Sequence, residues 1–378
     1  MRKVKLMLKR IYIDNFRCLV NFELTFDALH LFLGPNGSGK TSVFDALSKI
    51  QSFANGDGKV DQLFPATERT RWQESRLQQF ELELEGNGGT FKYELAIDHD
   101  PEGLRSRVKH ERLGFNGQPL LRVELGEVQL FRDNHSQGPT YTFDWTQSLL
   151  PTILPRPYNT QLTWFKERMQ RFVIVQISPV LMADESSGEE ARPSRRMENF
   201  VSWYRYLSAD QGKIFELTRV LKEILDGFEN FRFKKAGEHS QILKLIFTRQ
   251  PNGDGHVEYR LGELSDGQRM IIALYALLTC TQSENYTLCV DEPENYLALP
   301  EIQPWLTQLY DLCCQRKLQA LLISHHPELI NYLLASPVGY WFDHEPNTPV
   351  RAKPIATDNT SGLPFAELIA RGWLHEQA

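Results

Sequence analysis

The sequence lacks a long hydrophobic segment. Its longest wholly apolar run, residues 270–278, has nine residues, whereas a helix that spans a membrane needs about 20. Residues 1–10 are basic and alternate with apolar side chains, so they lack the continuous apolar core of a signal peptide and are expected to form a first strand. We therefore expect a cytoplasmic protein with no membrane partner.

The sequence also has few cysteines and no excess of basic residues over acidic ones. The five cysteines, an odd number spread over 378 residues, argue against a disulfide framework and for a reducing compartment. The 48 acidic residues outnumber the 42 basic ones, so the chain lacks the basic excess of a dedicated nucleic-acid binder. Contact with DNA or RNA would have to be local. The candidate basic clusters, which could equally be solvated surfaces, are Arg2, Lys3, Lys5, Lys9 and Arg10; Arg192, Arg195 and Arg196; and Arg232, Lys234 and Lys235.

The chain does contain an alternation of helices and strands that is typical of a parallel α/β sheet. In the last third, the apolar pattern predicts helices and strands in turn at residues 267–281, 287–291, 300–316, 318–324 and 327–335. Residues 76–98 predict a β-hairpin around a Gly-Asn-Gly-Gly turn. Residues 200–225 carry apolar side chains at helical spacing, and two strands are expected to pair across residues 251–255.

A glycine-rich turn follows the apolar strand at residues 29–33. It consists of Gly34, Pro35, Asn36, Gly37, Ser38, Gly39, Lys40, Thr41 and Ser42, and it fits the phosphate-binding (P-loop) pattern GxxxxGK[ST]. Its glycines allow backbone N–H groups to surround a polyphosphate, Lys40 is expected to contact the β and γ phosphates, and Thr41 to offer a hydroxyl to Mg²⁺. A chance glycine-rich turn is the alternative, but the flanking strand and helix argue against it.

A second apolar strand, at residues 287–291, ends in the acids Asp291 and Glu292. In a P-loop protein this arrangement, known as Walker B, lets the first carboxylate order the Mg²⁺ shell and the second polarise the attacking water. Alone the pattern is weak, because many strands enter a solvated loop through acidic residues. The P-loop makes the functional interpretation the stronger one.

Between these motifs, Leu-Ser-Asp-Gly-Gln at residues 264–268 precedes a helical run. With it, the chain resembles ABC-type ATPases, whose Leu-Ser-Gly-Gly-Gln signature closes over the γ-phosphate held by the other protomer. The resemblance implies that Ser265, Gly267 and Gln268 contact ATP across a homodimer. Asp266 departs from the commonest glycine, a departure familiar outside the transporters. A capped helix without a ligand is the alternative.

The resemblance implies roles for three more residues. His325 lies in a Ser-His-His-Pro-Glu-Leu segment that is similar to the switch-histidine segment, with His326 as its neighbour. Gln176 follows a predicted strand like a Q-loop glutamine, and Arg17, in Asn-Phe-Arg, resembles an arginine of SMC and RecF-like heads that approaches the phosphates. Each could instead be an ordinary surface or packing residue. The implied catalytic residues are Lys40, Glu292 and His325, and the implied Mg²⁺ ligands are Thr41, Asp291 and Gln176.

Several features of related ABC-type ATPases are not predicted from this sequence. The interval 176–264 has no heptad repeat and no cysteine, so no coiled-coil arm or zinc hook of the SMC type is predicted. Because few residues follow His325, we expect no Toprim nuclease domain of the OLD-family type. Ala298 replaces the acidic or histidine residue that the resemblance implies for the D-loop, which puts that contact to the partner in doubt, although Glu294 and Asn295 could still serve. A zinc site of Cys313, Cys314, His325 and His326 has poor geometry, because adjacent cysteines on a helix point in different directions.

The expected fold is thus an α/β, ABC-type P-loop NTPase head of two lobes, with a mixed sheet, an antiparallel β subdomain and a short helical insertion. The expected divisions are a nucleotide-binding lobe at residues 1–177, the insertion with a returning hairpin at 178–262, and a lobe with the signature, Walker B and switch histidine at 263–378.

The expected activity is ATP hydrolysis by a homodimer that closes around two MgATP, with higher-order assembly. Compact heads of this kind resemble ATPase subunits of bacterial antiphage systems of the Septu-like and retron-associated types, which act with a separately encoded effector, often a nuclease. A RecF-like DNA-binding clamp in repair is the alternative, and a nucleotide-controlled scaffold is a third. A toxin-like neighbouring gene would favour defence, and replication genes would favour repair.

Overall fold

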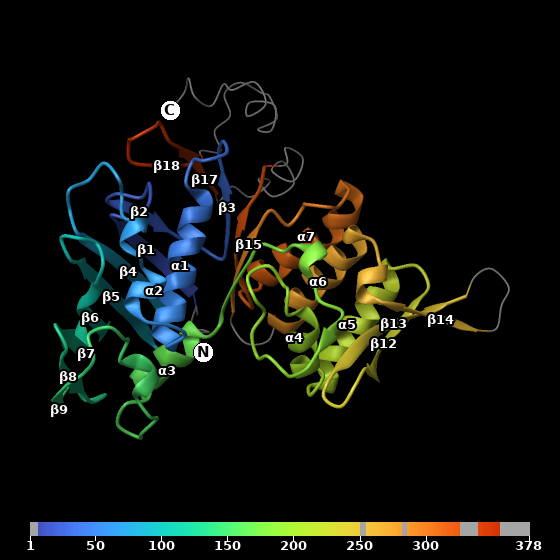
Figure 1. The fold of residues 1–378 in the computed structure, drawn as a ribbon, viewed down its shortest axis with the longest axis horizontal. Helices are drawn as coiled ribbons and strands as arrows, with labels where there is room; N and C mark the ends of the chain where they lie inside the picture. Colours follow the sequence, from blue (N-terminus) through green and yellow to red (C-terminus); the bar gives the residue numbers. More distant parts are fainter. Residues whose placement is uncertain (1–6, 250–254, 282–285, 326–338, 356–378) are drawn as a thin grey trace.

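Three β-sheets organise the chain. The computed structural model describes residues 7–249, 255–281, 286–325 and 339–355 (Figure 1). The first sheet is antiparallel and runs from edge to edge through β2 (Phe22–Thr25), β1 (Met7–Asp14), β4 (Leu77–Gly86), β5 (Gly89–His99), β6 (Ser106–Phe115), β7 (Gln118–Glu124), β8 (Glu127–Phe131) and β9 (Gln137–Thr142).

Alternation of apolar and polar side chains gives the first sheet one buried and one exposed face. Strand β4 buries every second residue, including Phe80 and Leu82. The predicted hairpin between β4 and β5 is confirmed: Asn87 and Gly88 form its turn with φ values of 47° and 87°, the geometry that Asn-Gly favours in a two-residue loop.

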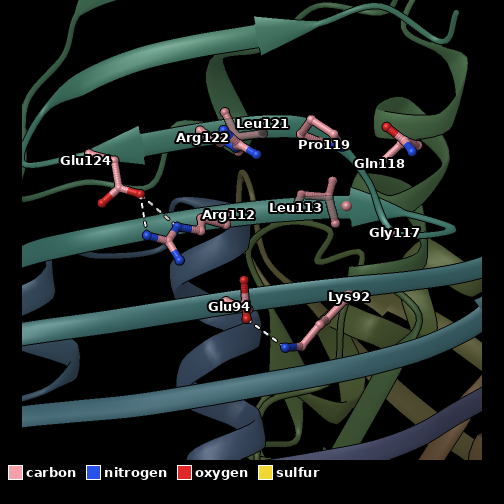
Figure 2. Close-up of a pocket in the computed structure, with 11 residues that line it drawn as sticks. Lys92, Glu94, Arg112, Leu113, Gly117, Gln118, Pro119, Leu121, Arg122 and Glu124 are labelled. Carbon is pink, nitrogen blue, oxygen red and sulfur yellow. Dashed lines mark hydrogen bonds and ion pairs between the residues drawn. The ribbon is translucent and has the colours of Figure 1, made fainter. Parts of the chain in front are cut away.

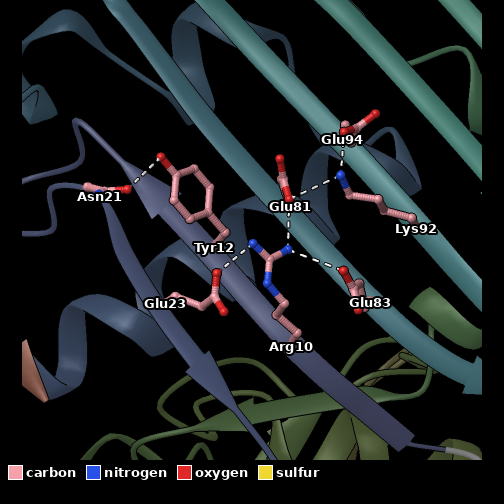
Figure 3. Close-up of polar contacts among 8 residues, drawn as sticks. All are labelled: Arg10, Tyr12, Asn21, Glu23, Glu81, Glu83, Lys92 and Glu94. Carbon is pink, nitrogen blue, oxygen red and sulfur yellow. Dashed lines mark hydrogen bonds and ion pairs between the residues drawn. The ribbon is translucent and has the colours of Figure 1, made fainter. Parts of the chain in front are cut away.

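Ion pairs cover the exposed face of this sheet. The Arg10 guanidinium lies 2.6 Å from the carboxylate of Glu23 and 2.7 Å from that of Glu81, while Lys92 contacts Glu81 and Glu94 (Figure 3). The hydrogen bond with Glu23 is the main cause that raises the pKa of Arg10. Because carboxylates hold these cations, this part of the face offers no free positive charge to a phosphate backbone.

The central sheet has six strands. Its order is β10 (Phe172–Val175), β15 (Thr287–Asp291), β16 (Gln319–Ile323), β3 (Leu29–Leu33), β17 (Gly339–Asp343) and β18 (Arg351–Pro354), with all neighbours parallel except the last pair. Every residue of β15 and β16 is buried, as expected for parallel strands covered on both faces. The carboxyl ends of β3, β15 and β16 meet at one edge of the sheet, where open α/β sheets bind ligands.

Helices cover both faces of the central sheet (Figure 1). Two hydrophobic cores result, one between the first and central sheets and one on the far side of the central sheet. The first contains residues of α1 (Lys40–Asn55), α2 (Val60–Leu63), η2 (Leu150–Thr152) and α3 (Thr160–Met169). The second contains residues of α4 (Phe200–Leu207), α5 (Gln211–Ile224), η4 (Leu261–Glu263), α6 (Asp266–Thr281) and α7 (Leu299–Cys314). Two further short helices are η1 (Ala66–Glu68) and η3 (Pro179–Leu181).

A third, smaller sheet accompanies the helices of the second core. Its order is β11 (Glu185–Ser186), β13 (Gln241–Thr248) and β12 (Phe228–Lys235), with β14 (His256–Arg260) also paired to β13. The helical stretch predicted at 200–225 is two helices, because the Asp210 carboxylate accepts hydrogen bonds from the backbone N–H groups of Gly212 and Lys213 and so starts α5. The helix predicted at 327–335 lies outside the described residues. No helix within the described ranges is long and apolar enough to cross a bilayer.

Candidate active site

The loop between β3 and α1 has a backbone that requires glycine. Gly34, Gly37 and Gly39 have φ values of 140°, 79° and 94°. A Cβ on Gly34 would lie 2.2 Å from the carbonyl oxygen of Phe342, and one on Gly39 would lie 2.8 Å from a methyl group of Val350. The segment from β17 to β18 therefore presses against the P-loop from outside and holds it in place.

Lys40 is folded into this loop. Its Nζ donates to the carbonyl oxygens of Gly34 and Pro35, both at 2.8 Å, and to the hydroxyl of Ser38 at 3.2 Å. Burial lowers the pKa of Lys40 to about 8, an effect that the nearby charge of Asp291 opposes. The loop thus concentrates a cation and backbone N–H groups at one point, which suits a polyphosphate.

Thr41 and Asp291 meet although 250 residues separate them. The Thr41 hydroxyl donates to Asp291 Oδ2 at 3.0 Å. Asp291 is 2% exposed, and burial raises its pKa to about 6. A hydroxyl beside a carboxylate fits Mg²⁺, which typically takes one or two protein oxygens together with phosphate and water. When bound, Mg²⁺ would neutralise charge on the phosphate oxygens.

Gln176 lies at the same edge. Val175 pairs with Val290 in the register of β10 and β15, so Gln176 is level with Asp291. Its backbone N–H donates to the carbonyl oxygen of Arg195 at 2.7 Å, while its side chain makes no hydrogen bond within the described part of the chain. The structure brings Gln176 to the expected edge without showing it as a ligand.

Glu292 and His325 face each other beyond the ends of β15 and β16. Glu292 has a φ of 54°, and its N–H donates to the carbonyl oxygen of Ile323 at 2.9 Å. Its Oε1 lies 3.5 Å from His325 Nε2, and its Oε2 accepts a hydrogen bond of 2.7 Å from Asn295. Burial is the main cause that lowers the pKa of His325, with the charge of Lys40 second. A neutral imidazole beside a partly exposed carboxylate suits the handling of a water molecule. His326 lies outside the described residues.

Glu294 fixes the backbone that carries His325. Its Oε1 accepts hydrogen bonds from the Ser324 hydroxyl at 2.6 Å and from the His325 backbone N–H at 3.1 Å. From the sequence, Glu294 was expected only as a candidate for the D-loop contact to a partner. Its position three residues after Asp291 was the only sequence signal that Glu294 belongs to the site. Only the fold shows that the carboxylate of Glu292 faces the imidazole of His325, whereas that of Glu294 binds the His325 backbone.

The signature residues form a helix cap. Ser265 Oγ accepts from the backbone N–H of Gln268 at 3.2 Å, and Gln268 Oε1 accepts from the backbone N–H of Ser265 at 3.0 Å, a reciprocal arrangement at the start of α6. A Cβ on Gly267 would lie 3.0 Å from the carbonyl oxygen of Tyr296. Ser265 is exposed, and within the described chain no hydrogen bond joins these residues to the P-loop.

Arg17 is held by two carboxylates. Its guanidinium pairs with Asp45 and lies 2.8 Å from Glu68. Asp45 also pairs with Arg195, and the charge of Arg195 lowers the pKa of Asp291 as a minor contribution. No sequence motif points to Asp45, although it lies four residues after Thr41 on the same side of α1. Arg195 was expected only as a member of a basic cluster.

An aromatic pair next to the P-loop was also missed. The rings of Trp72 and His344 are 6.3 Å apart with an interplanar angle of 32°. His344 directly follows β17, whose Phe342 contacts Gly34. Trp72 is 36% exposed. Nothing in the sequence around either residue distinguishes it from an ordinary surface aromatic.

Most of the basic clusters are engaged by acids. Arg192 lies 3.4 Å from Asp57, while Arg232 and Lys234 both pair with Glu258. Lys9 and Arg10 also have carboxylate partners, and the other members of their cluster lie outside the described residues. A cation that is already paired with a carboxylate gains less free energy from contact with a phosphate than an unpaired cation does. These clusters therefore give little support for nucleic-acid binding.

The raised pKa of Asp291 predicts a pH-dependent stability. Its pKa of about 6 in the folded state lies above its ordinary 3.8, so the folded state favours the protonated carboxyl, and this contribution is present below pH 4 and lost as the pH rises through 6. We expect Asp291→Asn, in EDTA, to gain up to about 3 kcal/mol of unfolding free energy relative to wild type between pH 4 and pH 7. Urea unfolding of the wild type and of Asp291→Asn across this pH range measures the difference. If the unfolding free energies of the two proteins changed in parallel with pH, the prediction would be contradicted.

Sequence comparisons match parts of this chain. A family described as "AAA ATPase domain" matches residues 7–90, and one described as "AAA domain, putative AbiEii toxin, Type IV TA system" matches residues 180–331. The OLD nuclease of Thermus scotoductus is 43% identical over 44 residues, 12% of this chain and 8% of the nuclease. The thiamine import ATP-binding protein ThiQ of Salmonella typhimurium is 34% identical over 95 residues, 25% of this chain and 35% of ThiQ. The chain therefore spans only a small part of either relative.

Structural comparison covers nearly the whole chain. An SMC head, solved in complex with the C-terminal winged-helix domain of ScpA, superposes with a TM-score of 0.53 at 10% identity, covering 93% of this chain and 98% of that one. At this identity the likeness shows the fold, which is that of an ABC-type P-loop ATPase head, as predicted. Together with the AAA matches and the OLD nuclease segment, it supports an SMC/OLD-like ABC-type ATPase head.

Proposed function

We propose that this chain hydrolyses ATP in a composite site formed between two copies of itself. The observation that carries the proposal is the convergence of Thr41, Asp291, Glu292 and His325 at one edge of the central sheet, next to the cradle that holds Lys40. The exposed Ser265 has no hydrogen bond to that cradle within the described chain. A second copy could supply the signature in a two-fold arrangement, because such an interface lets each copy complete the other's site.

In this proposal each residue acts by position and charge. Lys40 exchanges its bonds to the loop carbonyls for bonds to phosphate oxygens. Thr41, Asp291 and Gln176 would hold Mg²⁺. Glu292 orients a water molecule and accepts its proton, and the neutral His325 donates Nε2–H toward the γ-phosphate.

The remaining predicted contacts complete the nucleotide site. The partner's signature residues Ser265, Gly267 and Gln268 close over the phosphate tail through the amino end of α6, which favours an anion. Arg17 reaches the phosphates only if it leaves Asp45 and Glu68. Residues 1–177 act as the nucleotide-binding lobe, 178–262 as the insertion and 263–378 as the signature lobe.

We further propose that the ATPase cycle controls a separately encoded effector, a nuclease being the first choice, in antiphage defence. The family description that names a putative toxin of a type IV toxin–antitoxin system and the OLD nuclease segment support this role. The SMC head bound to a ScpA domain supports the idea that such a head recruits another protein. The free thiols of all five cysteines agree with a cytoplasmic setting. The ion-paired basic clusters favour an effector over the RecF-like DNA clamp.

Mixing two inactive variants tests the composite site. Lys40→Ala removes the phosphate-binding cation, and Ser265→Arg blocks the signature, so each homodimer is expected to be inactive. A one-to-one mixture should recover about a quarter of wild-type ATPase activity, because half of the dimers are mixed and each mixed dimer has one intact site of two. A mixture with no activity, although both variants form dimers by light scattering, would contradict a site shared between copies.

A further inference from the structure

A groove at the outer end of the first sheet combines apolar walls with unpaired positive charge. It has a volume of about 310 Å³ and lies between β8, β9 and residues 152–162, which lead into α3. Tyr141 is opposite the buried Val128, so it lies on the inner face of the sheet. Tyr141, Leu154 and Tyr158 line the groove and are 40%, 64% and 52% exposed, a high exposure for side chains of this size.

The charge in the groove has one sign. Arg132 and Arg156 line it, and no acidic residue is among its described lining residues. The Arg132 guanidinium lies 5.7 Å from the ring centre of Tyr158. Neither Arg132 nor Arg156 forms an ion pair within the described residues. The neighbouring Asp133 is engaged elsewhere: it accepts hydrogen bonds from the N–H and hydroxyl of Thr160, at 2.7 and 2.8 Å. Both cations are thus available to an acidic ligand.

The groove is preformed. Asn159 accepts a hydrogen bond of 2.7 Å from the backbone N–H of Arg156 and donates one of 3.1 Å to the carbonyl oxygen of Leu154. Lys166 Nζ donates to the carbonyl oxygens of Pro151 and Ile153, at 2.8 and 3.0 Å. A wall held in this way costs little ordering entropy when a ligand binds.

One side of the groove is an open sheet edge. Strand β9 ends the first sheet, and its outer edge pairs with no other described strand. An extended peptide can add to such an edge through main-chain hydrogen bonds while its alternate side chains enter the adjoining groove. Every second side chain of the peptide would then lie on the inner face of the sheet, the face that carries Tyr141.

We propose that this groove binds an extended segment of a second protein that carries an aliphatic or aromatic side chain flanked by acidic residues. The acidic residues pair with Arg132 and Arg156, and the apolar side chain lies against Leu154 and the two tyrosines. A single-stranded nucleic acid fits less well, because its backbone needs a continuous basic track, whereas this groove has two cations and mostly apolar walls.

The groove is separate from the P-loop. The C-terminal end of α1 lies near the groove, since a Cβ on Gly56 would be 2.9 Å from Pro151, and the P-loop is at the other end of this 16-residue helix, about 24 Å away. An occupant therefore leaves the nucleotide site free, and the inference does not depend on the proposed ATPase activity.

A random dodecapeptide display library, presented to the immobilised full-length protein, tests the proposal. We expect enriched peptides to carry Leu, Phe or Tyr next to Asp or Glu. Synthetic copies should bind at least about tenfold more weakly to Arg132→Gln/Arg156→Gln, measured by fluorescence anisotropy, because two charge-assisted hydrogen bonds are lost. Leu154→Glu, at an exposed position, should weaken binding similarly by placing a like charge beside the peptide's acids.

A matched double variant provides the control. Lys92→Gln/Arg112→Gln removes two cations from a hollow of about 420 Å³ on the other face of the same sheet, where Glu94 and Glu124 already hold them (Figure 2). It should bind the peptides like wild type. The proposal would be overturned if no peptides were enriched, or if the enriched peptides lacked acidic residues. It would also be overturned if both double variants bound the peptides with equal affinity, or if the protein bound an oligothymidine and Arg132→Gln/Arg156→Gln abolished that binding.

Discussion

Glu292→Gln is expected to lower the rate of ATP hydrolysis by at least about a hundredfold while ATP affinity stays close to that of wild type. The glutamine is nearly the same shape and can still accept the hydrogen bond from Asn295. Only the charge and the ability to accept a proton from water are lost. Because the proposed contacts to the phosphates come from the P-loop and Lys40 and not from Glu292, nucleotide binding should be unaffected.

Single-turnover hydrolysis and equilibrium binding of a fluorescent ATP analogue measure the two effects separately. Glu294→Gln is the matched control, since it is the same substitution two residues further along the chain. Glu294 accepts hydrogen bonds from Ser324 and from the backbone of His325, so we expect Glu294 to position His325. The Glu294→Gln variant should therefore lose less ATPase activity than Glu292→Gln. If Glu294→Gln were the more damaging change, the two acids would have to exchange roles.

Gly34→Ala is expected to have the largest effect on the P-loop itself. Its φ of 140° is essentially restricted to glycine, and its Cβ would lie 2.2 Å from the carbonyl oxygen of Phe342. Neither the loop nor β17 can move without disturbing the sheet edge. We expect ATP binding to be lost and the unfolding free energy to fall by about 1–3 kcal/mol beyond the backbone strain.

Gly37→Ala separates the clash from the backbone strain. Gly37 also has a positive φ, of 79°, but its Cβ would have no neighbour within 4 Å. Thermal and urea unfolding should therefore show a loss of only about 1–2 kcal/mol, the cost of a left-handed alanine. Equal destabilisation by both substitutions would show that Phe342 does not constrain the loop.

The sequence predicted the local parts of this protein well because their signals are local. The apolar runs of β3, β15 and β16 and the glycines between β3 and α1 each depend on near neighbours. For the same reason the predicted β4–β5 hairpin is confirmed, with its turn at Asn87 and Gly88. The break between α4 and α5 was missed, because a short polar cap competes with a continuous apolar pattern.

The sequence by itself determined which chemical groups this protein has: a P-loop, a strand that ends in two acids, a signature before a helix and a histidine after a strand. The tertiary structure alone decided their relations. Thr41 and Asp291, 250 residues apart, form a hydrogen bond. Glu292 contacts the imidazole of His325, whereas Glu294 binds its backbone. Arg17 forms ion pairs with Asp45 and Glu68. The physical reason is that spacing fixes local backbone geometry, whereas the partner of a charge depends on which strands lie side by side.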